Sequence, residues 1–342
     1  MSQPTLEILW YLVFVVVVIA YTVLDGFDLG VGAVHLFARK DIDRRIFLNA
    51  IGPIWDGNEV WLVVLVGALF AGFPAVYATL LSAFYLPVLI LLAGLIFRAV
   101  AIEFRSQTPH PLWRSIWDGV FALGSIVASL SLGFFLGNLV RGIPLDVHHD
   151  FVGDLAGLFN PYAILTSFTV LALFAMHGTI FLVGKTEGEL HERLRHWVNR
   201  AIVVFVSFYV ALTVVTLVSQ NHMVASLVGH PWVWVVAALN LLAIGAIPLL
   251  LKHRHDRLGF LASCFAILCL FVLYALGSFP NVIRSGIDPA AHSLTISNSF
   301  ASKKTLQILL IIVLIGIPAA LAYIGSVYYL FRGKVKLDSA SY

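Results

Sequence analysis

Nine stretches of this sequence are apolar over the length that a helix needs to cross a membrane. Such a helix takes about 20 mostly apolar residues to pass through roughly 30 Å of hydrocarbon. The stretches are residues 8–36, 50–72, 78–102, 115–140, 161–184, 200–219, 231–251, 258–280 and 305–331. Their connections are short, and 60% of the 342 residues are hydrophobic whereas 11% are charged. These features predict an all-α integral membrane protein, a single polytopic domain over residues 1–342 with nine transmembrane helices.

Basic residues predict how these helices are oriented, because Lys and Arg gather in the cytoplasmic connections of membrane proteins. When the connections are taken alternately, all but four of the 21 lysines and arginines fall on one side. The exceptions are Arg141, Arg284, Lys303 and Lys304. The bias places the N-terminus outside and the C-terminus in the cytoplasm, and it explains the net charge of +3 without a nucleic-acid partner. The sequence starts without a basic segment or a small-residue cleavage site, so we expect the first span to remain in the mature protein.

Acidic residues near or inside the apolar stretches are the strongest functional signal. A charge within a span is costly unless it faces other helices, a partner or water. Acids are absent from the apolar cores of the last five stretches, whereas the first four hold several. The candidates are Asp25, Asp28, Asp56, Glu59, Asp118 and the pair Arg98 and Glu103.

The depth of these residues places them in one layer. With a rise of 1.5 Å per residue, Asp25 and Asp28 lie about 25 to 30 Å below the outer surface, and Asp56 and Glu59 about 10 to 15 Å from the cytoplasmic side. Four helices thus bring acids to the cytoplasmic part of one four-helix group. Crowded carboxyl groups beside an arginine could pass protons through water, so we expect a proton-conducting cluster open to the cytoplasm.

Spacing supports this prediction but leaves structural alternatives open. Asp25 and Asp28 are three residues apart, as are Asp56 and Glu59, so each pair shares one helix face. Gly26 and Gly30 form a GxxxG pattern that permits close approach of another helix. Single acids would also fit helix caps or headgroup contacts, Asp118 beside Trp117 most of all. Arg98 and Glu103 would also fit an ordinary salt bridge at a helix end.

Histidines and cysteines give little sign of a cofactor site. Nearly all of the 12 histidines lie in connections; His177 lies within a span and His35 near the end of one. A single intramembrane histidine is more often a hydrogen-bonded core residue than an axial haem ligand. Cys264 and Cys269, both in the eighth stretch, are expected to be small packing residues, and no motif predicts a metal or nucleotide site.

Five motifs resemble subunit II of the bacterial cytochrome bd-type quinol oxidases. They are DGFDLG (25–30), GPIWDGNEVWL (52–62), FRAVAIEFR (97–105), WRSIWDG (113–119) and GKTEGELHER (184–193). Length and span count resemble that family over the whole chain, but the specific motifs concentrate between residues 24 and 119.

The resemblance implies a fold, a partner and an activity. The fold would be two four-helix bundles plus one additional peripheral helix, with a first bundle over residues 7–141 and a second set of five helices over 160–332. The complex would be a terminal respiratory oxidase in the bacterial cytoplasmic membrane that oxidises a quinol and reduces dioxygen to water. Two haem b groups and one haem d would belong to a pseudo-symmetric subunit I, the obligate partner, and this chain would hold no haem firmly and no catalytic residue. A small single-span accessory subunit and contacts with lipid and quinone are left open.

The resemblance also implies roles for individual residues. Asp56 matches a position that serves proton entry, and Asp28, Arg98 and Asp118 match positions that maintain the haem region. Asp25 lies in the same motif as Asp28. Glu59 is the weaker candidate for a proton carrier, because some relatives have glutamine at the matching position.

Two other functions remain open from the residues alone. A proton-coupled secondary transporter would also use intramembrane acids, although such proteins usually show repeats and a midplane site. A purely structural subunit would use the acids for hydrogen bonds between helices.

Overall fold

The computed structural model describes residues 2–337, which form a bundle of long helices with short connections. Within these residues, eight single helices are long and apolar enough to cross a membrane, and a bent pair supplies a ninth when counted as one span. The spans are α1 (Gln3–Val34), α2 (Asp41–Ile51) with α3 (Trp55–Gly72), α5 (Tyr85–Phe104), α6 (Pro111–Arg141), α8 (Pro161–Lys185), α9 (Gly188–Ser219), α11 (Pro231–Lys252), α12 (Asp256–Ser278) and α14 (Lys303–Leu330). The prediction of an all-α polytopic membrane protein is confirmed.

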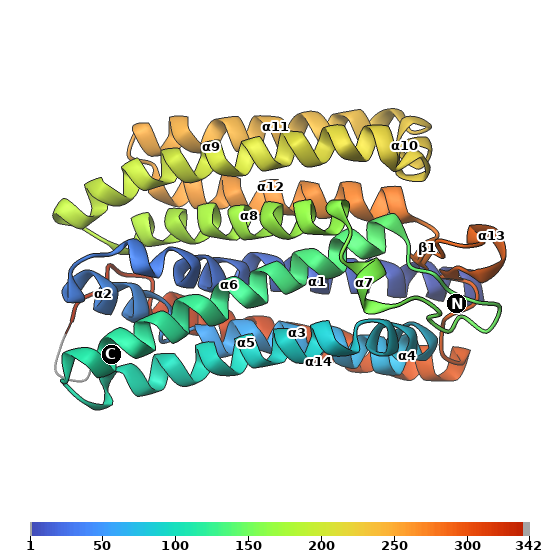
Figure 1. Cartoon of the computed structure of the whole chain (residues 1–342), viewed down its shortest axis with the longest axis horizontal. Helices are drawn as coiled ribbons and strands as arrows, with labels where there is room; N and C mark the ends of the chain where they lie inside the picture. The colour runs from blue at the N-terminus through green and yellow to red at the C-terminus, as the bar shows by residue number, and fades with distance from the viewer. Residues whose placement is uncertain (1, 338–342) are drawn as a thin grey trace.

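Shorter elements join or cap these spans. They are η1 (His35–Phe37), α4 (Pro74–Ala83), η2 (Arg105–Gln107), α7 (Leu155–Leu158), α10 (Asn221–Val228), α13 (Pro289–His292) and the antiparallel strands β1 (Asn281–Ile283) and β2 (Leu294–Thr295). The small hairpin, α7 and α13 lie at the end of the bundle where the chain begins (Figure 1).

Two expected spans are broken by proline. The stretch 50–72 begins instead in α2, which meets α3 at an angle of 50° across a break that contains Pro53. The stretch 78–102 is divided at Phe84 between α4 and α5, and Pro87 lies in the first turn of α5. Proline lacks a backbone N–H and its ring clashes with the preceding turn, so it fits the first turn of a helix and tends to kink or break a helix elsewhere. The span therefore begins at Tyr85 rather than at residue 78.

The helices stack in layers around α1 (Figure 1). This helix packs against α3, α6, α8 and α12, whereas α9 and α11 lie along one outer side. The last helix, α14, packs against α1 and α3, so it returns to the first helices of the chain after the second set has been completed. The division into two four-helix bundles with boundaries at 7–141 and 160–332 stays a prediction.

Glycines set the closest helix approaches. A Cβ atom on Gly30 would lie 1.8 Å from the carbonyl oxygen of Phe174, and one on Gly178 would lie 2.4 Å from the backbone nitrogen of Val31. Both contacts are far shorter than real atoms permit, so α1 and α8 can cross here only because neither position has a side chain. The predicted role of the GxxxG pattern in close helix packing is confirmed.

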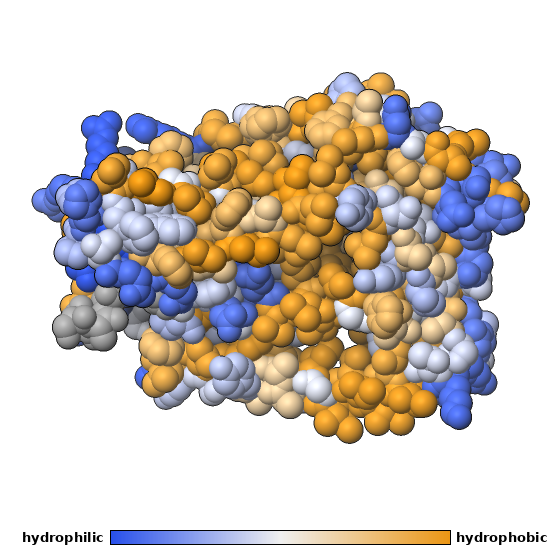
Figure 2. Space-filling view, turned by 60° about the horizontal axis from the view of Figure 1, so that its bottom comes forward, coloured by the Kyte–Doolittle hydropathy of each residue, from blue (hydrophilic) through white to orange (hydrophobic). Residues whose placement is uncertain are grey.

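The surface has the polarity of a membrane protein. Figure 2 shows one face on which hydrophobic residues fill the middle of the molecule and hydrophilic residues gather at both ends. Many large apolar side chains of the spanning helices are exposed, including Val63, Leu92, Val218, Leu242 and Ile315. Water would penalise such a surface, whereas lipid does not.

A side chain at Gly30 should separate α1 from α8. We expect Gly30→Ala to destabilise the folded protein by at least about 2 kcal/mol, because the added methyl group would overlap backbone atoms that cannot move independently. The thermal midpoint of the purified protein in detergent measures this effect. Gly245→Ala in α11 is the control, since a Cβ there meets no atom within 4 Å; equal midpoints for the two variants would contradict the prediction.

Candidate functional site

An arginine buried in the bundle joins three helices. Arg98 of α5 donates from Nη1 to Asp25 Oδ1 of α1 at 2.8 Å and from Nη2 to Glu59 Oε2 of α3 at 2.8 Å. The side chains of Arg98 and Asp25 are 0% exposed, and that of Glu59 is 24% exposed. Such charged hydrogen bonds are strong when water is excluded, so they fix these three helices relative to one another.

Asp28 lies in the same layer but has a neutral partner. Its Oδ2 accepts a hydrogen bond of 2.7 Å from Asn58 Nδ2 of α3. Asn58 Oδ1 in turn accepts one of 2.8 Å from the hydroxyl of Tyr328 on α14. We call the six residues Asp25, Asp28, Asn58, Glu59, Arg98 and Tyr328 the acidic site.

The acidic site has more carboxyl groups than its arginine can neutralise. Asp25, Asp28 and Glu59 share Arg98, which pairs with two of them. Asp25 Oδ2 and Asp28 Oδ1 are buried and accept no hydrogen bond from any residue in the described range 2–337. A proton bound at these oxygens would balance the excess negative charge, which is the chemistry expected of a proton-transfer site.

A groove connects the acidic site with the surface. It has a volume of about 820 Å³, runs between α3 and α5, and is lined mainly by apolar side chains, with Asp56 and Glu59 among its few polar ones. Asp56 is exposed, and Glu59 lies three residues later on the same helix. Glu59 therefore touches both the groove and the buried arginine.

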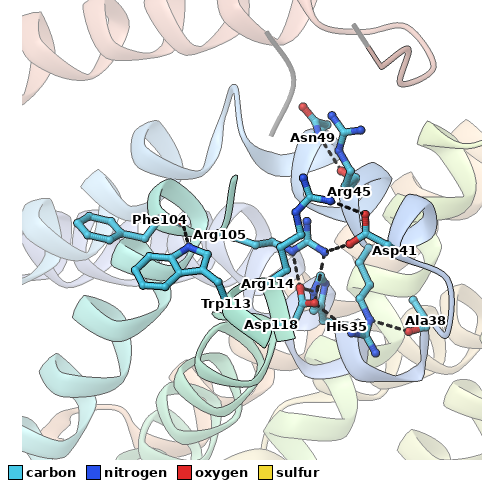
Figure 3. Close-up of polar contacts among 11 residues, drawn as sticks. His35, Ala38, Asp41, Arg45, Asn49, Phe104, Arg105, Trp113, Arg114 and Asp118 are labelled. Carbon is cyan, nitrogen blue, oxygen red and sulfur yellow. Dashed lines mark hydrogen bonds and ion pairs between the residues drawn. The ribbon is translucent and has the colours of Figure 1, made fainter. Parts of the chain in front are cut away.

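Asp118 belongs to a second cluster (Figure 3). Its carboxylate accepts hydrogen bonds from Arg105 Nε at 2.6 Å, His35 Nε2 at 2.7 Å and Arg44 Nη1 at 3.0 Å. Asp41 pairs with Arg105 at 2.7 Å and with Arg114 at 3.1 Å. We call the six residues His35, Asp41, Arg44, Arg105, Arg114 and Asp118 the arginine cluster.

The arginine cluster is separate from the acidic site, although the sequence predicted a single layer. Arg98 and Arg105 are seven residues apart, as are Asp28 and His35, which corresponds to about 10 Å along each helix. Asp118 is 1% exposed, so the alternative of a headgroup contact is wrong for this residue.

Electrostatics in the arginine cluster favour fixed charges. Burial alone would lower the pKa of the Arg105 guanidinium, but hydrogen bonds and charge from Asp118 and Asp41 outweigh it and raise that pKa. A carboxylate that accepts several charged donors is held firmly in its ionised form. This geometry suits a structural ion cluster better than a group that releases and rebinds protons.

Sequence reasoning missed several partners. In the sequence, Arg105 stands in the FRAVAIEFR motif, Arg44 indicates only topology, and His35 is notable only for its place near the end of a span. Tyr328 gave no signal, because a tyrosine near a helix end is typical of the membrane interface. Glu103 lies exposed at the end of α5, where its backbone carbonyl accepts a hydrogen bond from Gln107.

The buried residues His177 and His35 both form hydrogen bonds with other groups of the protein. His177 uses Nδ1 with Ser263 at 2.8 Å and Nε2 with the carbonyl of Val23 at 3.0 Å, and it stacks on Phe260. His35 uses Nε2 with Asp118. The prediction that His177 is a hydrogen-bonded core residue is confirmed.

Comparison with known proteins gives one consistent result. The model of the family described as cytochrome bd terminal oxidase subunit II matches residues 6–331. The chain is 32% identical to "Cytochrome bd-I ubiquinol oxidase subunit 2" of Escherichia coli strain K12, over 98% of this chain and 96% of that protein. It is 31% identical to "Cytochrome bd ubiquinol oxidase subunit 2" of Bacillus subtilis strain 168, over 97% and 98% of the two chains.

A solved structure shares the fold. The bd oxidase from Geobacillus thermodenitrificans contains a chain that aligns with a TM-score of 0.78 and 19% identity, covering 96% of this chain and 98% of that one. The family match spans both the acidic site and the arginine cluster, and the relatives match this chain from end to end. The chain therefore belongs to the cytochrome bd terminal oxidase subunit II family and is a multi-pass membrane subunit of a respiratory oxidase.

Proposed function

We propose that this chain stabilises a haem-bearing subunit I and supplies protons from the cytoplasm for the reduction of dioxygen to water by a quinol. Family membership favours this function over a secondary transporter. The complex would lie in the bacterial cytoplasmic membrane with the N-terminus of this chain outside and its C-terminus in the cytoplasm, as the distribution of basic residues predicts.

The haems of the complex are assigned to the partner subunit in this proposal. When bound there, two haem b groups and one haem d supply the electron transfer and the oxygen chemistry. His177 does not suit axial ligation as it is placed, because both of its ring nitrogens are in hydrogen bonds. His35 is held by its Nε2 on Asp118. The contribution of this chain is then packing and proton delivery.

The proton route would start at Asp56 and continue through Glu59 to Asp25 and Asp28. The observation that carries this proposal is the position of Glu59, which lines the surface groove and is hydrogen-bonded to the buried Arg98. Glu59 is thereby a better candidate than its sequence suggested. Within the site, the free oxygens of Asp25 and Asp28 are the groups on which a proton would rest.

The groove is the surface that we assign to subunit I. Asp56 is exposed on an otherwise apolar wall, and lipid would penalise a carboxylate there by several kcal/mol. A partner that covers the groove would remove this penalty and would lead the proton route toward its haems. A small accessory subunit, and quinone or lipid contacts of this chain, would occupy other surfaces.

The arginine cluster supports a second, structural role. Asp118 joins α6 to η1, α2 and η2 through hydrogen bonds to three basic side chains. We assign Asp118 to the maintenance of this end of the bundle and the other acids to proton transfer.

Replacing Asp56 with asparagine should slow the enzyme without disassembling it. Asparagine keeps the size and polarity of the side chain but cannot carry a proton, so we expect quinol oxidase turnover to fall at least about tenfold while the haem optical spectrum is retained. Oxygen consumption and charge separation in membrane vesicles measure the effect. Glu189→Gln, at an exposed acid at the start of α9, is the matched control; unchanged turnover in Asp56→Asn would remove this residue from the route.

Replacing Asp118 with asparagine should instead destabilise the complex. The change leaves three basic side chains without their shared carboxylate, which typically costs about 3 to 5 kcal/mol for a buried ion pair. We expect a lower thermal midpoint and loss of haem from the purified complex. Asp41→Asn should cost at most about 1 kcal/mol, because Asp41 is 49% exposed. A stable Asp118→Asn complex with full haem content and little turnover would move Asp118 into the proton route.

A further inference from the structure

The last helix touches the acidic site although it is barely buried in the bundle. Leu306 is the buried residue of α14, and most of the helix is exposed along its length. The helix is held near its two ends. At one end Trp10 Nε1 donates to the carbonyl of Leu306 at 3.1 Å, and at the other Tyr328 donates to Asn58.

The segment after α14 fixes the end that carries Tyr328. Lys185 Nζ of α8 donates to the carbonyl of Phe331 at 2.5 Å, and Val335 donates from its backbone nitrogen to the carbonyl of Lys185 at 2.9 Å. Lys334 Nζ reaches the carbonyl of Val183 at 3.2 Å. These contacts hold the chain on the end of α8, so Tyr328 is anchored on both sides of its hydrogen bond to Asn58.

The two hydrogen bonds of Asn58 use the opposite ends of its amide group. A carboxylate only accepts hydrogen bonds, whereas an amide has a donating nitrogen and an accepting oxygen. Asn58 satisfies Asp28 only when its nitrogen faces the carboxylate, and the tyrosine hydroxyl satisfies the oxygen on the other side. Because a tyrosine hydroxyl can donate or accept, Asp28 is the group that sets the orientation of the amide, and Tyr328 holds the amide in that position by donating to its oxygen.

We propose that Tyr328 is a positioning residue that holds the Asn58 amide in place, with its nitrogen on Asp28. The hydroxyl acts through Asn58, which is 0% exposed and lies between the two side chains. Asp25, Glu59 and Arg98 complete the charged surroundings of Asp28, and Arg98 donates hydrogen bonds to the other two. The inference rests on the proposed role of Asp28 in proton transfer, and it adds a residue from a helix that the motifs do not include.

Removal of the hydroxyl tests the proposal in the assembled oxidase. Tyr328→Phe preserves the ring and its packing, so we expect the haem spectrum to be retained while quinol oxidase turnover falls about threefold to tenfold. The solvent deuterium isotope effect on turnover should rise, because proton delivery becomes a slower step. Tyr329→Phe is the matched control: it lies next along the helix, is 68% exposed and stacks on Arg332.

A double-mutant cycle tests whether Tyr328 acts through Asn58. In an Asn58→Ala background, Tyr328→Phe should cause little further loss of turnover, because the amide that the Tyr328 hydroxyl holds is gone. Independent, multiplicative losses would overturn the proposal, as would loss of haem in Tyr328→Phe, which would assign the hydroxyl to assembly.

Asp28→Asn separates this inference from the function on which it rests. Normal turnover and a normal isotope effect in Asp28→Asn would overturn the proposed role of Asp28 and the inference with it. Impaired turnover in Asp28→Asn together with normal behaviour of Tyr328→Phe would overturn the inference alone. We expect impaired turnover in both Asp28→Asn and Tyr328→Phe, together with non-additive effects of the Tyr328 and Asn58 substitutions.

Discussion

The ion pairs of Arg98 are the interaction on which the membrane-embedded site depends. A guanidinium with no exposed surface is expensive to place in an apolar bundle, and carboxylates at hydrogen-bond distance offset that cost. Because those carboxylates come from α1 and α3, the charge of one residue sets the register of three helices. The packing agrees with this register: a Cβ on Gly124 would lie 3.0 Å from the backbone nitrogen of Arg98, so α6 closes directly over the arginine.

The two charged clusters have opposite composition and therefore opposite character. The acidic site has three carboxyl groups around one arginine, and a group within it can take up a proton to balance the charge. The arginine cluster has three arginines around two aspartates, and each aspartate forms ion pairs with two of the arginines. Under the proposed roles, the same residue type would serve different purposes two helix turns apart, because the neighbouring charges differ.

Much of this arrangement could be predicted from the sequence. Apolar length predicted the spans, and the cost of intramembrane charge identified Asp25, Asp28 and Arg98 as residues that face other helices. The separation of Asp118 from them could not be predicted, since depth estimates are too coarse to distinguish layers about 10 Å apart. Nor could Tyr328, because its contact joins residues 270 positions apart in the sequence. The positions of Pro53 and Pro87 could have predicted the two breaks, whereas apolar length alone could not.

The attachment of α14 has a consequence for how the protein is made. The helices that carry the acids leave the ribosome well before Tyr328, because a chain is built from its N-terminus. Until α14 reaches α1 and α3, the amide of Asn58 lacks the hydroxyl that faces it. The acidic site is therefore complete only after translation has passed Tyr328, and a shorter nascent or truncated chain would lack one of its hydrogen bonds.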